Sequence, residues 1–186
     1  MKRSPRNLGR QAAFVASMGA LGNVLALLTV SIPTPTSQIA LDLSHLATLI
    51  VALYSGPVLG GMTGAIVSIV PFYRFGVAGL FGPLVGFLII PLKSLTGITA
   101  GFLGKRLRPA FATLLGYVPE CFATYLYFVW IAPFFLPQVK EFITGAFILA
   151  VLSKAWVELG IIAVVMETIM RRHILDRIMG NVYREK

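Results

Sequence analysis

The sequence predicts an all-α membrane protein, a bundle of six transmembrane helices with both termini in the cytoplasm. The chain of 186 residues is 57% hydrophobic and only 12% charged, with a mean hydropathy of +0.84. A soluble domain of this size carries about a quarter charged residues, so much of this surface must face lipid. The hydrophobic residues form long runs, and the basic residues cluster between these runs. We interpret residues 1–186 as one integral membrane domain.

Six apolar segments account for the bundle. A spanning helix needs about 20 residues, so the second segment is short for this role. The first segment is longer than the apolar region of a signal peptide and is followed by Pro33-Thr-Pro-Thr, which indicates a retained helix. Gly56-Pro57 and Leu107-Arg-Pro109 separate later segments. The predicted helices are residues 11–32, 45–54, 58–72, 80–103, 110–136 and 142–170.

The distribution of basic residues predicts the orientation of the bundle. Residues 1–10 form a basic segment with four Lys or Arg residues, three more lie between the fourth and fifth helices, and five follow the last helix. The opposite loops hold only Arg74 and Lys140. Because cytoplasmic loops carry an excess of Lys and Arg, we expect residues 1–10 and the tail 171–186 to be cytoplasmic.

Small residues recur at helical spacing in three places. Ala12, Ala16 and Ala20 form one smooth stripe on the first helix, where another helix can approach closely. The pairs Gly60-x-x-x-Gly64 and Gly97-x-x-x-Gly101 have the same spacing. We interpret the two glycine pairs as ordinary internal packing, because this spacing is common in membrane helices.

Four ionisable residues lie deep inside predicted helices: Lys93, Glu120, Lys154 and Glu158. Each costs about 2.5–3.5 kcal/mol at the bilayer centre on insertion scales, so they should face the bundle interior. Lys154 and Glu158 are four residues apart and share a helix face. Two interpretations remain open at this point. The four residues contact a ligand, or they form a salt-bridge network that only holds helices together.

Further polar side chains accompany these charges. A polar stripe with 4-3-4-3 spacing follows the fifth helix, which indicates an interior surface; its members are Thr113, Tyr117, Glu120, Thr124 and Tyr127. The loop 31–44 holds Asp42, with His45 at its edge, and is long enough to act as a lid over a site. The simpler alternative for Asp42 is a helix cap. The candidate substrate-binding residues are therefore Asp42, His45, Tyr73, Arg74, Lys93, Glu120, Thr124, Tyr127, Trp130, Lys154 and Glu158. Arg74 as a solvated charge and Trp130 as an interfacial residue are the simpler alternatives.

The sequence argues against an enzyme. It has no P-loop, no HExxH and no GxSxG motif. Its two histidines are far apart, and its single cysteine, Cys121, excludes an internal disulfide. We expect no catalytic residue, no metal and no cofactor. The alternatives are a small membrane enzyme acting on a lipid or isoprenoid substrate and a structural membrane assembly protein.

Residues 41–61, LDLSHLATLIVALYSGPVLGG, resemble the region around the second helix of S-components of energy-coupling factor (ECF) transporters. The stripe of Ala12, Ala16 and Ala20 resembles a motif on the first helix of that family. The resemblance implies a vitamin-capture subunit in the prokaryotic plasma membrane. It implies as partners a transmembrane coupling subunit (EcfT-like), which the alanines would contact, and two cytoplasmic ATPase subunits (EcfA-like). It places the substrate site between the first loop and helices four to six.

The resemblance favours riboflavin slightly as the substrate. Riboflavin binders of this family resemble the Leu-Asp-Leu-Ser sequence at residues 41–44 and carry a lysine in the sixth helix, which Lys154 matches. They place an asparagine one turn before that lysine, where this chain has Val151. Lys93 and Lys154 would also suit a carboxylate-bearing ligand such as pantothenate or folate. The aromatic side chains Tyr125, Tyr127 and Trp130 would suit a flat ring.

Overall fold

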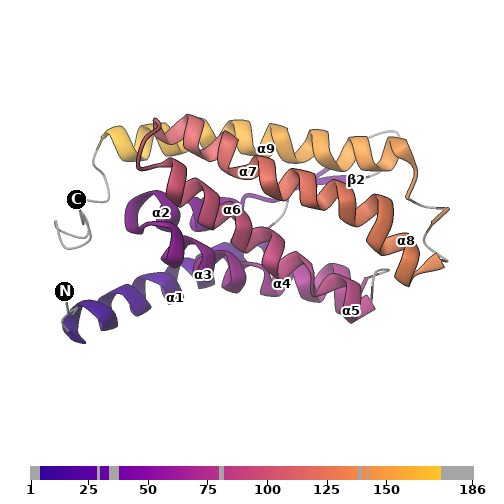
Figure 1. The fold of residues 1–186 in the computed structure, drawn as a ribbon, viewed down its shortest axis with the longest axis horizontal. Helices are drawn as coiled ribbons and strands as arrows, with labels where there is room; N and C mark the ends of the chain where they lie inside the picture. The colour runs from indigo at the N-terminus through magenta and orange to yellow at the C-terminus, as the bar shows by residue number, and fades with distance from the viewer. Residues whose placement is uncertain are drawn as a thin grey trace.

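A computed structural model describes residues 5–28, 30–33, 38–79, 82–137, 140–141 and 143–172 (Figure 1). The long helices are α1 (Pro5–Leu27), α2 (His45–Ser55), α3 (Pro57–Val67), α6 (Ile89–Leu103), α7 (Pro109–Leu126) and α9 (Gly145–Arg171). Short helical segments extend them: α4 (Ile69–Pro71), η1 (Phe72–Val77), α5 (Gly82–Gly86), η2 (Tyr127–Ile131) and α8 (Ala132–Phe135). Two strands, β1 (Val30–Pro33) and β2 (Gln38–Leu41), join α1 to α2.

Four continuous helical stretches among the described residues are long and apolar enough to cross a membrane. They are Pro57–Val77, Gly82–Leu103, Pro109–Phe135 and Gly145–Arg171. They make the chain a multi-pass membrane protein and confirm the helical character that the sequence predicts. The helix α2 is too short to count as a span. The total of six spans and the orientation stay predictions.

The connection between α1 and α2 corrects one predicted boundary. The first helix ends at Leu27, not at residue 32, and an antiparallel hairpin follows in which Val30 pairs with Leu41 and Pro33 with Gln38. The β-branched residues Val30 and Ile32 directly before Pro33 favour extended backbone. The fold is therefore all-helical apart from this hairpin, within the residues that the structure describes.

The two chain ends also differ from the expectation. Helix α1 begins at Pro5, so residues 5–10 of the predicted basic segment are helical. At the other end α9 continues to Arg171. The rest of the predicted tail, from residue 173 on, lies outside the described residues.

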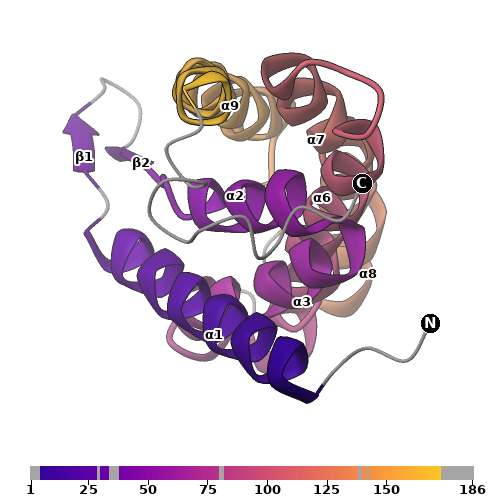
Figure 2. The same cartoon turned by 90° about the vertical axis from the view of Figure 1, so that its left-hand side faces the viewer.

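The short helix α2 lies at the centre of the bundle. Its residues Ala47, Leu49, Val51 and Ala52 have no exposed surface. The end-on view shows α1, α3, α6 and α9 arranged around it (Figure 2). Gly56 ends α2 with a φ of 93°, a conformation that favours glycine. The chain then reverses into α3, as the Gly56-Pro57 break predicts.

Glycines bring α3 and α6 into backbone contact. A Cβ on Gly60 would lie 2.7 Å from the carbonyl oxygen of Gly97, and one on Gly64 would lie 2.5 Å from that of Lys93. At the far end of the contact, a Cβ on Gly101 would lie 2.6 Å from the Cα of Pro57. The prediction that these glycines serve internal packing is confirmed. This contact also fixes the position of Lys93.

Helix α1 turns its alanine stripe away from the bundle. Ala12, Ala16 and Ala20 are all exposed. Further along the same helix, Asn23 donates a hydrogen bond to the carbonyl of Ile66 (2.8 Å) and accepts one from the N–H of Val70 (2.9 Å). These two bonds hold α1 on α3 and α4 and leave the alanines without an internal packing role.

Candidate ligand-binding site

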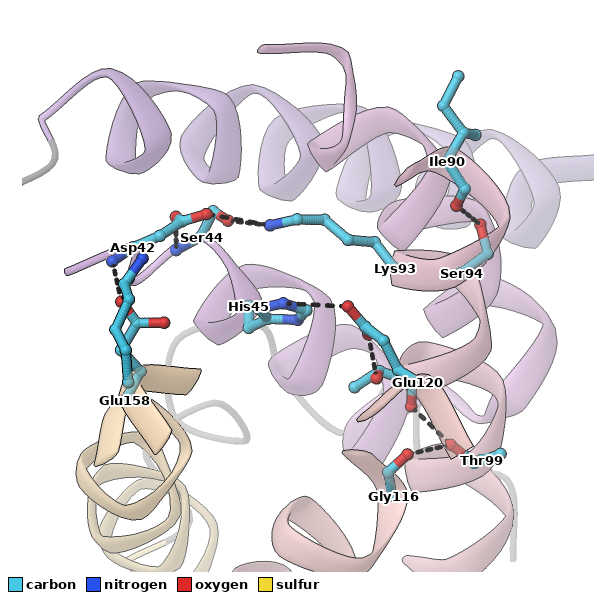
Figure 3. Close-up of polar contacts among 12 residues, drawn as sticks. Asp42, Ser44, His45, Ile90, Lys93, Ser94, Thr99, Gly116, Glu120 and Glu158 are labelled. Carbon is cyan, nitrogen blue, oxygen red and sulfur yellow. Dashed lines mark hydrogen bonds and ion pairs between the residues drawn. The ribbon is translucent and has the colours of Figure 1, made fainter. Parts of the chain in front are cut away.

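A network of charged and polar side chains lies where the start of α2 meets α6, α7 and α9 (Figure 3). It joins residues that are distant in the sequence. Asp42 and Ser44 come from the segment between β2 and α2, and His45 is the first residue of α2. The other members come from the three long helices. Four of the predicted candidates on the helices meet here: Lys93, Glu120, Lys154 and Glu158. Asp42 and His45, predicted from the loop, join them.

Lys93 holds the segment before α2. Its buried ammonium group donates to the Oγ of Ser44 (2.6 Å) and lies 3.2 Å from Oδ2 of Asp42. Asp42 accepts a further bond from the N–H of Ser44 (2.9 Å) at its other oxygen. Burial acts to raise the pKa of Asp42. The Lys93 ammonium, the nearby His45 and the bonds from Ser44 outweigh burial and hold this pKa below its ordinary value.

Glu158 connects this segment to α9. Its Oε1 accepts a hydrogen bond from the backbone N–H of Asp42 (2.5 Å) and lies 3.3 Å from the Nζ of Lys154. The predicted shared face of Lys154 and Glu158 is thus confirmed. Asp42 is held at both ends, by α6 through its carboxylate and by α9 through its backbone.

The second branch of the network links His45 to α7. The Nε2 of His45 lies 3.6 Å from Oε1 of Glu120, and the hydroxyl of Thr96 donates to Oε2 of the same carboxylate. Thr96 and Lys93 are three residues apart on α6, so both face the network. The antiparallel helices α6 and α7 touch at Ala100 and Gly116, and one turn further on this register sets Thr96 opposite Glu120.

Aromatic rings surround the histidine branch. The ring of Tyr117 meets that of His45 edge to face, with centroids 6.0 Å apart, and meets that of Trp156 in the same way at 5.6 Å. Tyr117 belongs to the predicted polar stripe, most of which is buried as expected. Trp156 comes from α9, between Lys154 and Glu158. Aromatic rings therefore pack beside the charged groups at His45.

The sequence analysis missed four members of this site as ligand candidates. They are Ser44, Thr96, Tyr117 and Trp156. The spacing of Thr96 from Lys93 was the available signal, because residues three apart share a helix face. Nothing local in the sequence distinguishes Trp156 from a lipid-facing residue.

The structure places the remaining candidates outside the network. Tyr73 and Trp130 are 61% and 73% exposed. Arg74 donates to the carbonyl of Ala26 (3.0 Å) near the end of α1, so it is not simply a solvated charge. Tyr127 packs in a separate apolar cluster with Phe128, while Thr124 is half-buried on α7. Their roles in binding stay predictions.

The network supplies both signs of charge in a small volume. It holds the carboxyl groups of Asp42, Glu120 and Glu158 and the ammonium groups of Lys93 and Lys154. In the part of the chain that the structure describes, no three His, Cys, Asp or Glu residues are arranged to hold a metal ion. Such a site is suited to hydrogen bonding and ion pairing with a polar organic molecule.

Comparison with known proteins identifies the fold. No family model and no curated protein sequence matches the chain. Among solved structures, the S component of a bacterial ECF transporter superposes with a TM-score of 0.64 at 15% identity, covering 92% of this chain and 99% of that one. This chain has the S-component fold. The resemblance that residues 41–61 suggest is confirmed at the level of the fold. In this S-component fold, the polar network lies at the junction of the first loop with α6, α7 and α9.

Proposed function

We propose that this protein is the substrate-capture subunit of an ECF-type importer for a water-soluble vitamin or related micronutrient. It would work in the prokaryotic plasma membrane with an EcfT-like coupling subunit and two EcfA-like ATPases. The observation that carries the proposal is the S-component fold with a buried polar network beneath its first loop. The neighbour is described as a transporter component, and this supports a binding protein over an enzyme.

The network supports ligand binding better than a purely structural role. A structural network would satisfy its buried polar atoms, because each unpaired one costs about 1–3 kcal/mol. Here Nδ1 of His45 is buried with no hydrogen-bond partner among the described residues. Lys154 can donate three hydrogen bonds, yet Glu158 is its one charged partner in the described part of the chain, and its side chain is 23% exposed. Both groups have capacity left for a ligand.

The chemistry of the site suits the three vitamins that the sequence favours. Lys154 would pair with an electron-rich or anionic group, and the rings of Tyr117 and Trp156 would lie against a flat ring. Riboflavin is the first substrate to test. Pantothenate and folate, which carry carboxylates for Lys93 or Lys154, are the next.

The test is native mass spectrometry of the detergent-purified protein, with release and identification of any bound small molecule. A retained vitamin at one equivalent is the expected result. If the protein is empty, it is titrated with riboflavin, pantothenate and folate while its thermal unfolding is followed. The absence of any stabilisation would overturn the vitamin proposal. Turnover of a lipid or isoprenoid by the protein alone would favour the enzyme alternative.

A second experiment tests the proposed coupling face. The exposed stripe of Ala12, Ala16 and Ala20 leaves room for a closely packed helix of the coupling subunit. Ala16→Trp should abolish vitamin uptake by cells that carry the complete transporter and leave vitamin binding unchanged. Leu149→Trp, at an exposed position on α9, is the control and should transport normally. Normal uptake by Ala16→Trp would remove the stripe from the interface.

A further inference from the structure

The two ring nitrogens of His45 have different surroundings. Its Nε2 faces the Glu120 carboxylate at 3.6 Å. Its Nδ1 is buried and has no partner among the described residues. The whole residue is 7% exposed. A buried imidazole nitrogen without a partner requires an explanation, because the great majority of buried side-chain polar atoms in proteins are hydrogen-bonded.

The charge on the neighbouring Glu120 carboxyl group decides which nitrogen of the ring carries the proton. An ionised carboxylate only accepts hydrogen bonds. Thr96 donates its hydroxyl hydrogen to Oε2 of Glu120, which leaves Oε1 to face the imidazole. With an ionised Glu120 carboxylate, the nitrogen that faces Oε1 carries the proton and the other nitrogen keeps its lone pair. In this tautomer Nδ1 of His45 is a hydrogen-bond acceptor.

Two neighbouring side chains restrict the orientation of the His45 ring. The Glu120 carboxyl group faces one edge of the imidazole at 3.6 Å, and Tyr117 lies edge to face against the ring at 77°. Tyr117 is itself held against Trp156 at 84°. The segment before the ring is tied down by Lys93 through Ser44 and Asp42. An acceptor on a ring with so little freedom can discriminate between ligands that differ in one hydrogen-bond donor.

We propose that Nδ1 of His45 accepts a hydrogen bond from a neutral N–H or O–H group of the captured molecule, so that the site selects ligands with an imide, amide or hydroxyl donor. The inference rests on the proposed capture function and names a recognition element within the same site. Glu120 and Thr96 act as positioning residues, since they set the tautomer of His45 without being required to touch the ligand.

The first test measures the tautomer and needs no ligand. The full-length protein is labelled with ¹⁵N-histidine, and its ring nitrogens are observed by NMR; His173→Gln removes the signals of the second histidine. We expect a proton on Nε2 of His45 and none on Nδ1. A proton on Nδ1 would overturn the inference, whatever the protein binds. Glu120→Gln, whose amide can donate to Nε2, should shift the tautomer ratio toward Nδ1–H.

The second test is a double-mutant cycle with riboflavin and its N3-methyl derivative, which lacks the imide N–H. Methylation should weaken binding to the wild type by about tenfold, the value of one hydrogen bond. In His45→Leu, which has no acceptor at this position, methylation of riboflavin should not weaken binding. His45→Asn, whose side-chain oxygen can occupy nearly the same place as Nδ1, should keep part of the preference and guards against a variant that fails to fold.

The outcomes separate the two proposals. If riboflavin binds and methylation costs the same in the wild type and in His45→Leu, the inference is wrong and the capture function stands. If pantothenate or folate binds in place of riboflavin, the same variants are titrated with that vitamin, and an affinity unchanged by His45→Leu again overturns the inference. If no vitamin binds while the expected tautomer is seen, the failure lies with the capture function.

Discussion

Helix α6 packs in different ways on two of its sides. Toward α3, glycines bring the backbones together, and the space that a Cβ would need is already occupied by carbonyl oxygens. Toward the start of α2 and toward α7, Lys93 and Thr96 extend polar side chains into a charged network. The first side holds the helix in place without any polar side chain, and the second places chemical groups where a ligand could meet them. Stability and binding should therefore respond to different substitutions on one helix.

The largest expected effect is the loss of the folded protein on introducing a side chain into the glycine contact. Gly97→Val would drive a branched side chain into the carbonyl of Gly60, and overpacking of this kind costs about 1–3 kcal/mol or more. The free energy of unfolding in mixed micelles and the yield of monodisperse protein measure it. Gly160→Ala on α9, where a Cβ would meet no atom within 4 Å, is the matched control and should be neutral or slightly stabilising. Equal yields for the two variants would contradict the close contact.

A substitution on the polar side should affect binding before it affects folding. Lys154→Ala removes the most exposed charge of the network, and the loss of a charge-assisted bond to ligand should weaken vitamin binding by about tenfold to a hundredfold. Isothermal titration of the purified variant measures the affinity. Lys105→Ala, at an exposed position after α6, is the control with unchanged binding. If the yield of Lys154→Ala collapses while the surviving protein binds normally, the lysine serves only its ion pair with Glu158.

Loss of the hydrogen bond from Thr96 to Glu120 should lower stability without the backbone clash that Gly97→Val introduces. Thr96→Val keeps the shape of the side chain and removes the donor to the buried carboxylate, which should lower the free energy of unfolding by about 1–3 kcal/mol. Thr168→Val, which removes an exposed hydroxyl that bonds only within its own helix, should change it by less than about 0.5 kcal/mol. Thermal unfolding of the two variants side by side is the measurement. Equal melting temperatures would show that Thr96 does not support Glu120.

The smallest effect concerns pH. The pKa of Asp42 lies below its ordinary value near 3.8, so the stability from its contact with Lys93 is fully present above that value and is lost as the pH falls through the lower folded pKa. The difference in melting temperature between the wild type and Asp42→Asn should stay constant from pH 7 to about pH 4 and narrow only below it. A difference that narrows already between pH 7 and pH 5 would show that Asp42 is not held by Lys93.

The sequence located several elements closely. The breaks at Gly56-Pro57 and Leu107-Arg-Pro109 separate helices, because proline and glycine have local conformational effects that need no tertiary contact. The sequence placed the first helix boundary wrongly, because the short run Leu28-Thr-Val-Ser-Ile32 is mostly apolar and suits the end of a helix as well as a strand of a hairpin. Only pairing with residues 38–41 distinguishes the two.

In the candidate site, too, some features could be predicted from the sequence and others could not. Depth in an apolar helix was enough to select Lys93, Glu120, Lys154 and Glu158, because lipid penalises any charge that does not face the interior. The i, i+4 spacing was enough to pair Lys154 with Glu158. Spacing within one helix carried no information on which groups meet between helices. Tyr73 was selected at the end of the third helix and Trp130 as an aromatic residue toward the outer end of the fifth, and the structure leaves both exposed.

The sequence by itself determined that this chain spans a membrane, where most of its helices begin and end, and which charges must turn inward. These properties follow from local backbone preferences and from the cost of placing a charge in lipid, and both act residue by residue. The tertiary structure decided that Asp42 is shared between α6 and α9, that Thr96 stands opposite Glu120, and that one nitrogen of His45 is left without a partner. These contacts depend on the register between helices, which is set by the close approach of backbones at glycine and alanine and has no local signature in the chain.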